Sequence, residues 1–241
     1  MLDLGTGFRA WGETLTPNGA LRASVLVTHL HFDHVQGLPF FEPVDRDGVR
    51  LDVFGPRPER GGVAEAFADL VRPPYFPLRP AELGGDIRFH DVEDEELPLG
   101  EAVVTARAVP HLGPTNGYRV DWEGVSLAYV SDHQAPATLD SVPHAVLELA
   151  DGVDLLIHDA QFTAAEWERK GDWGHSTVDY AVLVAREAGA RCLALFHHDP
   201  GHDDDQIDRL VLHARRTAER LGVDDVLAAA EGLTLSVERH A

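Results

Sequence analysis

The stretch Val27-Thr28-His29-Leu30-His31-Phe32-Asp33-His34 places three histidines and an aspartate within six residues. The apolar run from Ser24 to Val27 predicts a buried strand, so these polar residues follow the end of a strand. Alternation along an extended segment directs His29 and His31 to the same side. Imidazole nitrogen and carboxylate oxygen are ligands that Zn²⁺, Mn²⁺ and Fe²⁺ accept. A surface histidine cluster with Asp33 as a helix N-cap is the alternative, but capping needs only one such residue. We therefore predict a metal site here.

The form His-x-His-x-Asp-His, present here as His29 to His34, resembles the signature of the metallo-β-lactamase superfamily. The resemblance covers nearly the whole chain. It implies an α/β fold, the αββα four-layer sandwich, built as a single hydrolase domain over residues 1–241, with a site for two metals at one edge of its two sheets. Relatives usually carry an opening β-hairpin before the position of Leu2-Asp3-Leu4-Gly5, whereas this sequence begins in the middle of that pattern. Either the hairpin is missing, or the natural protein begins upstream of Met1.

Composition restricts the possible partners. With 241 residues and 44% apolar content, the chain can bury one sizeable core. A net charge of −21 and the lack of a long basic run argue against long nucleic acid as a partner. The single cysteine, Cys192, excludes a disulfide framework. No stretch has the character of a signal peptide or membrane span, which predicts a cytoplasmic protein without a membrane partner.

Hydrophobic periodicity and the positions of glycine and proline predict strands that come first in a run and then alternate with helices, which is typical of an α/β fold. The expected strands are 24–27, 51–54, 102–109, 116–121, 125–131, 154–157, 191–196, 226–229 and 233–237. The expected helices are 35–41, 62–71, 163–170, 176–188 with Ser176 as N-cap, and 203–221. Residues 91–96 are expected to form a solvated turn. The loop 73–80 is expected to use its two aromatic residues either as a wall of the substrate pocket or as anchors.

Further donors follow three later predicted strands, in Val109-Pro110-His111, Ser131-Asp132 and Phe196-His197-His198. The residues alone leave His111 open as an ordinary loop histidine, and they leave both His197 and His198 available. Aligned with the family's motif, His197 is the expected ligand, and alternation directs His198 the other way. The resemblance implies two divalent metal ions, with zinc expected and manganese or iron as alternatives. It assigns His29, His31 and His111 to one metal, Asp33, His34 and His197 to the other, and Asp132 as the bridge.

The stretch Gly174-His175-Ser176-Thr177 resembles the Gly-His-Ser-Thr stretch of ribonuclease Z and its bacterial phosphodiesterase relatives, in which this histidine reaches the scissile phosphate. His175 lies just before a predicted helix start, where free N–H groups favour an anion. A capping-region histidine without chemistry is the alternative. We interpret His175 as catalytic, together with Asp33, which can orient the attacking hydroxide. The stretch His158-Asp159 and His133 are expected to support the site from behind its ligands.

These features predict a metal-dependent phosphodiesterase that acts on a small or cyclic phosphodiester through a metal-bridging hydroxide. A carboxyl-ester, thioester or lactone hydrolase of the same fold is the nearest alternative. A tRNA-processing nuclease would need a basic arm that the sequence does not show. A metal-binding module without turnover is the alternative outside enzymes. A homodimer stays open, because a missing opening hairpin would expose strand edges.

Overall fold

Two separate β-sheets organise the chain. The computed structural model describes residues 1–16 and 19–237, and it divides into an N-terminal unit, Met1–Glu93, and a C-terminal unit, Asp94–Ala241. Each unit holds one sheet with helices packed on it, as the αββα expectation requires of each half.

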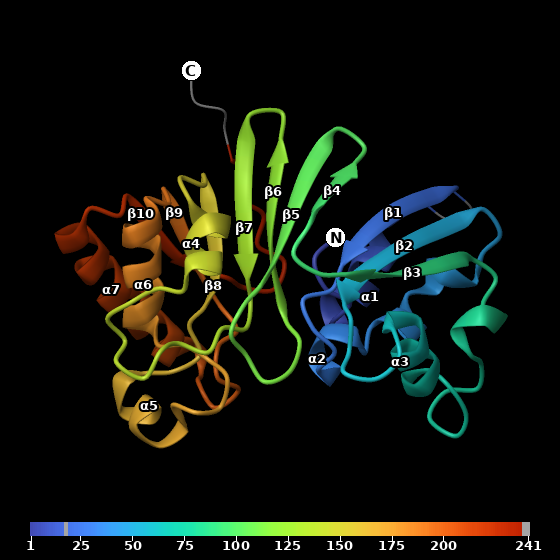
Figure 1. Cartoon of the computed structure of the whole chain (residues 1–241), viewed down its shortest axis with the longest axis horizontal. Coiled ribbons are helices and arrows are strands. Elements are labelled where there is room, and N and C mark those ends of the chain that lie inside the picture. The colour runs from blue at the N-terminus through green and yellow to red at the C-terminus, as the bar shows by residue number, and fades with distance from the viewer. Residues whose placement is uncertain (17–18, 238–241) are drawn as a thin grey trace. The chain divides into compact units, whose positions relative to one another are not determined.

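The N-terminal unit is built on a three-stranded parallel sheet of β1 (Leu21–Leu26), β2 (Val49–Pro56) and β3 (Asp86–Val92), in that order. Its helices are α1 (Thr6–Thr14), the single-turn α2 (Phe32–Val35) and α3 (Val63–Leu70), joined by 3-10 turns at Leu38–Phe40, Glu42–Asp45 and Pro80–Glu82. Helix α3 packs on β2 and β3 (Figure 1). In this contact the ring of Phe67 stacks on that of Phe89, with centroids 4.9 Å apart. This apolar core fixes the end of β1, from which the histidine-rich stretch continues.

The first residues of the chain hold α2 in place. The amide of Leu4 donates to the carbonyl of His34 (2.8 Å), and the amide of Gly37 donates to the carbonyl of Leu4 (2.6 Å). A Cβ atom at Gly37 would lie 2.1 Å from the carbonyl oxygen of Gly5, so only glycine permits this approach. The histidine-rich stretch, residues 29–34, is thereby held in place at both ends, by β1 before it and by the contacts of Gly37 after it.

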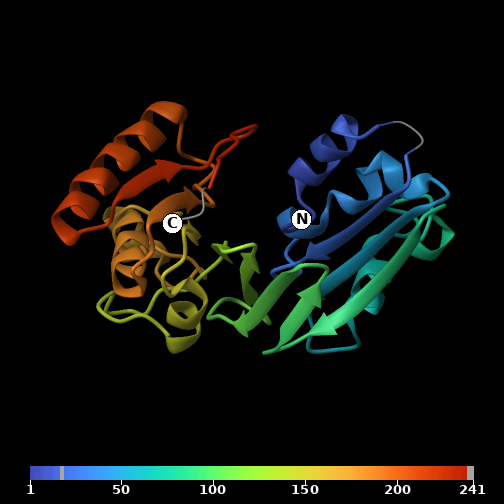
Figure 2. The ribbon, with the colours of Figure 1, turned by 90° about the horizontal axis from the view of Figure 1, so that it is seen from above.

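The C-terminal unit is built on a seven-stranded sheet in the order β10-β9-β8-β7-β6-β5-β4. Strands β4 (Glu96–Leu99), β5 (Ala102–Ala108), β6 (Asn116–Trp122) and β7 (Val125–Val130) are antiparallel, whereas β7, β8 (Leu155–Asp159), β9 (Cys192–Phe196) and β10 (Asp225–Ala228) run parallel. Helices α4 (His144–Ala150), α6 (Val178–Ala188) and α7 (Asp204–Leu221) pack side by side (Figure 1). Figure 2 shows this row of helices along one face of the sheet. Helix α5 (Ala164–Lys170) follows β8.

The parallel strands explain where the polar residues gather. Strands β7, β8 and β9 end at Val130, Asp159 and Phe196, and the carboxyl ends of parallel neighbours meet at one edge of a sheet. The end of β8 and the loops that follow β7 and β9 therefore bring Asp159, Asp132 and His197 to the same place.

Several expected elements differ from the structure. Strands β3 and β4 and helices α1 and α4 were not expected, and the residues 91–96 assigned to a solvated turn include the end of β3 and the start of β4. Residues 35–41 form the end of α2 and a 3-10 turn rather than one helix, because Pro39 interrupts it. Residues 233–237, all of them described, form no strand. The N-cap of α6 is Thr177, whose hydroxyl accepts from the amide of Tyr180, and not Ser176.

Residues 73–80 form the expected loop. The ring of Phe76 packs edge-on against Phe40, with centroids 6.1 Å apart, so this residue anchors the loop. Tyr75, by contrast, is 79% exposed.

Candidate metal centre

The N-terminal unit gathers three imidazole rings at the end of β1. The centroid of the His29 ring lies 4.4 Å from that of His31 and 4.2 Å from that of His34. His29 and His34 are buried, whereas His31 and Asp33 are exposed. An Asp33 carboxylate oxygen lies 3.3 Å from Nε2 of His34. The stretch that the sequence singled out is therefore a compact set of nitrogen and oxygen donors within one unit.

A buried carboxylate that the sequence reasoning missed supports this set. Asp3 accepts hydrogen bonds from the backbone amide of Thr28 (2.7 Å) and from Nδ1 of His34 (2.8 Å). Its backbone is left-handed, with φ of 53°, a conformation that non-glycine residues adopt only when the surroundings hold them there. With Nδ1 of His34 donating to Asp3, Nε2, on the side of the ring that faces Asp33, is the nitrogen that can serve as a metal ligand.

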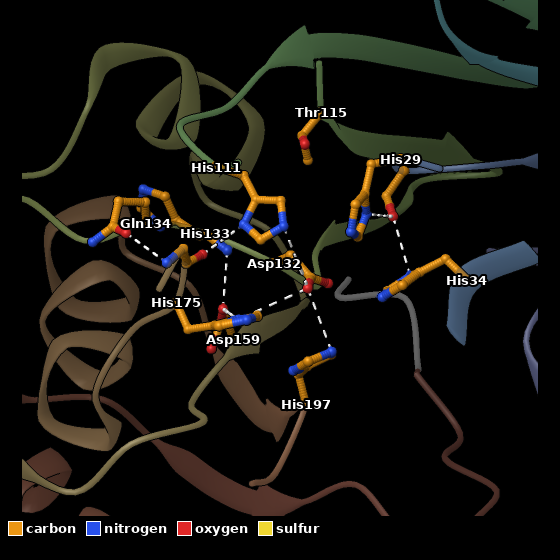
Figure 3. A network of polar contacts seen from close by, with 12 residues as sticks. His29, His34, His111, Thr115, Asp132, His133, Gln134, Asp159, His175 and His197 are labelled. Carbon is orange, nitrogen blue, oxygen red and sulfur yellow. Dashed lines mark hydrogen bonds and ion pairs between the residues drawn. The ribbon is translucent and has the colours of Figure 1, made fainter. Parts of the chain in front are cut away.

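The C-terminal unit brings together donors from separate segments, as Figure 3 shows. His111, Asp132 and His175 each offer an atom within 4.8 Å of the others. Nε2 of His197 lies 3.4 Å from a carboxylate oxygen of Asp132, and Nε2 of His111 lies 3.9 Å from the same oxygen. Asp132 is thus the common neighbour of three histidines (Figure 3).

Each of these rings is held by the protein through its other nitrogen. Nδ1 of His111 donates to the carbonyl of Gly174 (2.6 Å). A Cβ atom at Gly174 would lie 2.7 Å from this nitrogen, which explains the glycine in the Gly-His-Ser-Thr stretch. Nδ1 of His197 lies 3.1 Å from the side-chain amide of Gln161. Both histidines therefore present Nε2 toward Asp132.

The structure separates the two neighbouring histidines after β9. His197 has a left-handed backbone, with φ of 56°, and its ring lies beside Asp132. His198 instead directs Nε2 to the carbonyl of Ala229 (3.3 Å), and burial lowers its pKa. The two rings thus lie in different places, and the left-handed backbone at His197, just beyond the end of β9, accounts for this rather than strand alternation.

His175 is oriented by a buried carboxylate. Its Nδ1 donates to Asp159 (2.9 Å), and its ring stacks on that of His197 with centroids 4.8 Å apart. Asp159 is fully buried and also accepts from the backbone amides of His133 (3.0 Å) and Gln161 (3.0 Å). The carboxylate is therefore rigidly placed, and it fixes both the orientation and the tautomer of His175.

Behind Asp159 lies a pair of fully buried histidines. Nδ1 of His158 donates to the carbonyl of Asp159 (2.7 Å), so Nε2 of this ring accepts from Nδ1 of His133 (3.1 Å). Burial, reinforced by the neighbouring His158 and His111, holds the pKa of His133 well below its ordinary value. Burial also lowers the pKa of His158. Both rings are neutral near pH 7, and they support Asp159 and through it His175, rather than a metal-binding residue directly.

The donor sets fit a divalent metal by their chemistry. They consist of imidazole nitrogens and carboxylate oxygens, the ligands of zinc, manganese and iron sites. In each unit, histidines use Nδ1 for a protein partner and present Nε2, an arrangement that metal-binding histidines commonly show. The sequence identified the donors but not their supports, Asp3, Gly174 and Gln161, because the partner of a ring nitrogen depends on tertiary packing.

None of the helices in residues 1–16 and 19–237 is both long enough and apolar enough to cross a membrane.

Comparison with known proteins identifies the family. Residues 3–198 match the model of the β-lactamase superfamily domain. Ribonuclease Z from Halobacterium salinarum is 30% identical over 214 residues, covering 73% of this chain and 70% of the relative. Ribonuclease Z from Bacillus licheniformis is 28% identical over 237 residues, covering 79% of this chain and 75% of the relative.

Solved structures share the fold. The short form of human tRNase Z superposes with a TM-score of 0.70 at 19% identity, covering 98% of this chain and 87% of that one. A diphosphatase of the PhnP family superposes with a TM-score of 0.68 at 21% identity, covering 99% and 79%. These likenesses confirm the metallo-β-lactamase fold expected from the sequence.

The expectation that long nucleic acid is an unlikely partner is wrong, because relatives at up to 30% identity are named ribonuclease Z. The net charge misled because it is a sum over the whole chain, whereas phosphate contacts depend on local charge. Residues 1–93 contain 14 of the 41 acidic residues and 9 of the 20 basic ones, and residues 70–81 contain two arginines and no acidic residue. The chain belongs to the β-lactamase superfamily, on its ribonuclease Z-like branch, and is a metal-dependent hydrolase.

Proposed function

We propose that the protein is a phosphodiesterase with two metal ions, zinc being the expected metal, acting on a small or cyclic phosphodiester. The ligands in this proposal are His29, His31, Asp33, His34, His111, Asp132 and His197, with Asp132 shared by both ions. The family shown by the sequence match supports a metal-dependent hydrolase. The step from hydrolase to phosphodiesterase rests on His175.

The observation that carries the proposal is the pairing of His175 with Asp159 beside Asp132. A carboxylate can only accept, so Nδ1 of His175 carries the proton shared with Asp159, and Nε2 is the atom that can exchange a proton with a substrate. The ring lies next to His197 and Asp132 rather than in a separate pocket. A proton donor at this position suits an alkoxide leaving group, which phosphodiester hydrolysis produces.

The residues then have distinct tasks. When bound, a pair of divalent ions supplies Lewis-acid stabilisation of phosphate oxygens and lowers the pKa of a bound water toward neutrality. His175 acts as a general acid when both of its nitrogens carry a proton: Nε2 gives its proton to the departing oxygen, while Nδ1 keeps the proton that it donates to Asp159, which holds the ring aligned for the transfer. Asp33, exposed next to His34, orients the attacking nucleophile.

A second candidate is cleavage of RNA, which the name of the relatives favours. The catalytic step would be the same, so the two candidates differ in substrate size rather than in chemistry. Tyr75, 79% exposed in the loop 73–80 of the N-terminal unit, would be available to stack on a base of a longer strand.

The test is hydrolysis of bis(p-nitrophenyl) phosphate by metal-loaded protein, beside a chelator-stripped sample. Cyclic nucleotides, a single-stranded RNA oligonucleotide and p-nitrophenyl acetate are assayed in parallel, and bound metal is counted by elemental analysis. Metal-dependent turnover of the diester is expected. Protein that holds two metals per chain and cleaves only the acetate would overturn the phosphodiesterase in favour of a carboxyl-ester hydrolase. Preference for the oligonucleotide over the small diesters would select the second candidate.

A further inference from the structure

Lys170, at the end of α5, is the single lysine of the chain, beside 19 arginines. Its side chain is 25% exposed, and its Nζ forms an ion pair with Asp199 (2.7 Å). The same ammonium group lies over two aromatic rings, 5.1 Å from the centroid of Phe162 and 5.4 Å from that of Trp173. One cation is therefore bound by a carboxylate and two ring faces at once.

The carboxylate partner lies on the turn that follows His197. Asp199 also accepts from the backbone amide of Gly201 (2.8 Å), so its carboxylate closes this turn while it binds Lys170. His197 just before it has the left-handed backbone, which is unfavourable for a residue with a Cβ atom and persists only where the surroundings enforce it. The ion pair with Lys170 ties this strained turn to α5.

The two rings lie next to the other histidines. The ring of Phe162 meets that of His175 edge-on, with centroids 5.8 Å apart, and Phe162 is fully buried. Trp173 directly precedes Gly174, whose carbonyl accepts from Nδ1 of His111. Lys170 thus contacts three segments of the candidate site. Asp199 lies two residues after His197, the ring of Phe162 contacts that of His175, and Trp173 precedes Gly174.

We propose that Lys170 is a positioning residue. It keeps His197, His175 and the Gly174 carbonyl that binds His111 in their places around Asp132. It touches none of the reacting atoms and acts through Asp199, Phe162 and Trp173. The proposal rests on the proposed function, since it takes these histidines as parts of one metal-dependent site. Both the ion pair and the ring contacts require a positive charge, so an arginine can replace the lysine and an uncharged chain of the same length cannot.

The test compares K170M, which keeps the length of the side chain and removes its charge, with K170R, which keeps the charge. Arg169→Met is the matched control, because it removes one charge from the exposed neighbour on the same helix. Zinc affinity is measured by competition with a chromophoric chelator, and kcat/KM is measured with bis(p-nitrophenyl) phosphate. Since groups that orient metal ligands typically contribute a factor of about 10 to 100, K170M is expected to lose that much zinc affinity or kcat/KM. R169M should match the wild type, and K170R should recover most of the loss.

Equal zinc affinity and kcat/KM in K170M and R169M would overturn the proposal, and so would a K170R variant as impaired as K170M. A wild-type protein that binds zinc but cleaves no diester would refute the proposed function alone, because the affinity comparison would still test Lys170. If K170M fails to fold, acetylation of the folded wild-type protein removes the same charge at the single lysine, with mass spectrometry separating it from the N-terminal amine. Acetylated protein with unchanged zinc affinity would equally overturn the positioning role.

Discussion

The two units supply the candidate metal-binding groups in opposite ways. The N-terminal unit takes its histidines and aspartate from one continuous stretch, residues 29–34, and supports it with one buried carboxylate, Asp3. The C-terminal unit takes three donors, His111, Asp132 and His197, from separate segments, and it supports the two histidines with the carbonyl of Gly174 and the side-chain amide of Gln161. The first set is defined by local sequence, whereas the second exists only once β7, β8 and β9 have paired. Substitutions in the two units should therefore separate metal binding from catalysis.

Loss of a donor is expected to have the largest effect. His31→Ala in the N-terminal unit and Asp132→Ala in the C-terminal unit should both reduce diester hydrolysis to the level of chelator-stripped protein, because each removes a ligand that the chemistry requires. Elemental analysis of the purified variants should show less bound metal in both. His144→Ala, which alters a side chain that is 93% exposed, is the control. A His31→Ala protein with its full metal content would show that the N-terminal set does not bind the metal.

Loss of His175 should affect turnover without affecting the metal. In His175→Ala we expect kcat for a cyclic nucleotide, whose leaving group is an alkoxide, to fall by about a hundredfold or more, the usual contribution of a general acid, whereas hydrolysis of bis(p-nitrophenyl) phosphate, which releases the stable p-nitrophenolate, should fall less. Bound metal should stay at the wild-type level, since Asp132, His111 and His197 are retained. Normal diester hydrolysis by this variant would end the catalytic assignment of His175.

The contrast between the units also explains what the sequence could predict. The donors of residues 29–34 could be predicted from the sequence because ligand type and spacing appear together there. His111 and His197 could be assigned as ligands only through the family resemblance. Asp3 has no local signal, since its partner His34 lies 31 positions away. Helix α1 contains two glycines, which weaken helix propensity, and is favoured by the packing of Phe8 and Trp11 on Phe41. Strand β3 does show period-two alternation at Ile87 and Phe89, so that signal was present in the sequence.

Substitution of the two supporting carboxylates, Asp3 and Asp159, should affect zinc affinity and kcat differently. Asp3→Asn removes the acceptor that orients His34, so zinc affinity should fall by about 10- to 100-fold. Asp159→Asn leaves the donors intact and disturbs only the orientation of His175, so kcat should fall while zinc affinity stays near wild type. Chelator competition and steady-state kinetics on both proteins separate the two effects. If Asp159→Asn weakens zinc binding as much as Asp3→Asn does, the supports of the two units are not distinct.

The close backbone approach at Gly37 gives a prediction on stability. Gly37→Ala forces a Cβ atom against the carbonyl of Gly5 and should lower the free energy of unfolding by about 1–3 kcal/mol, as overpacking usually does. Gly7→Ala is the matched control, because it lies in α1 with no atom near its Cβ position and should be neutral or slightly stabilising. In the C-terminal unit, Gly117→Ala would meet only side-chain atoms, which can shift, so its cost should be smaller. Urea unfolding of the three variants measures the order, and a Gly37→Ala protein as stable as Gly7→Ala would contradict it.

The smallest expected effect is on the pH dependence of the free energy of unfolding, to which one ion pair in each unit contributes. The hydrogen bond from Arg107 lowers the pKa of Glu148 in the C-terminal unit, and the hydrogen bond from Arg50, aided by His90, lowers that of Asp52 in the N-terminal unit. A lowered pKa in the folded state means that the charged carboxylate favours folding. That contribution is fully present above the ordinary pKa, 4.5 for Glu148 and 3.8 for Asp52, and it is lost as the pH falls through the lowered folded values.

Glu148→Gln and Asp52→Asn should therefore lower the urea midpoint slightly at pH 7 and not at all once the pH lies below both folded values. Solvent exposure keeps both effects small. Whether the two variants shift the same unfolding transition tests whether the two units unfold together. If residues 1–241 fold as the single domain that we expect from the sequence, both variants shift one common transition, because two-state unfolding admits only one. If each variant shifts a transition of its own, reported separately by Trp11 and by the tryptophans of the C-terminal unit, the units unfold independently and the single-domain expectation is wrong.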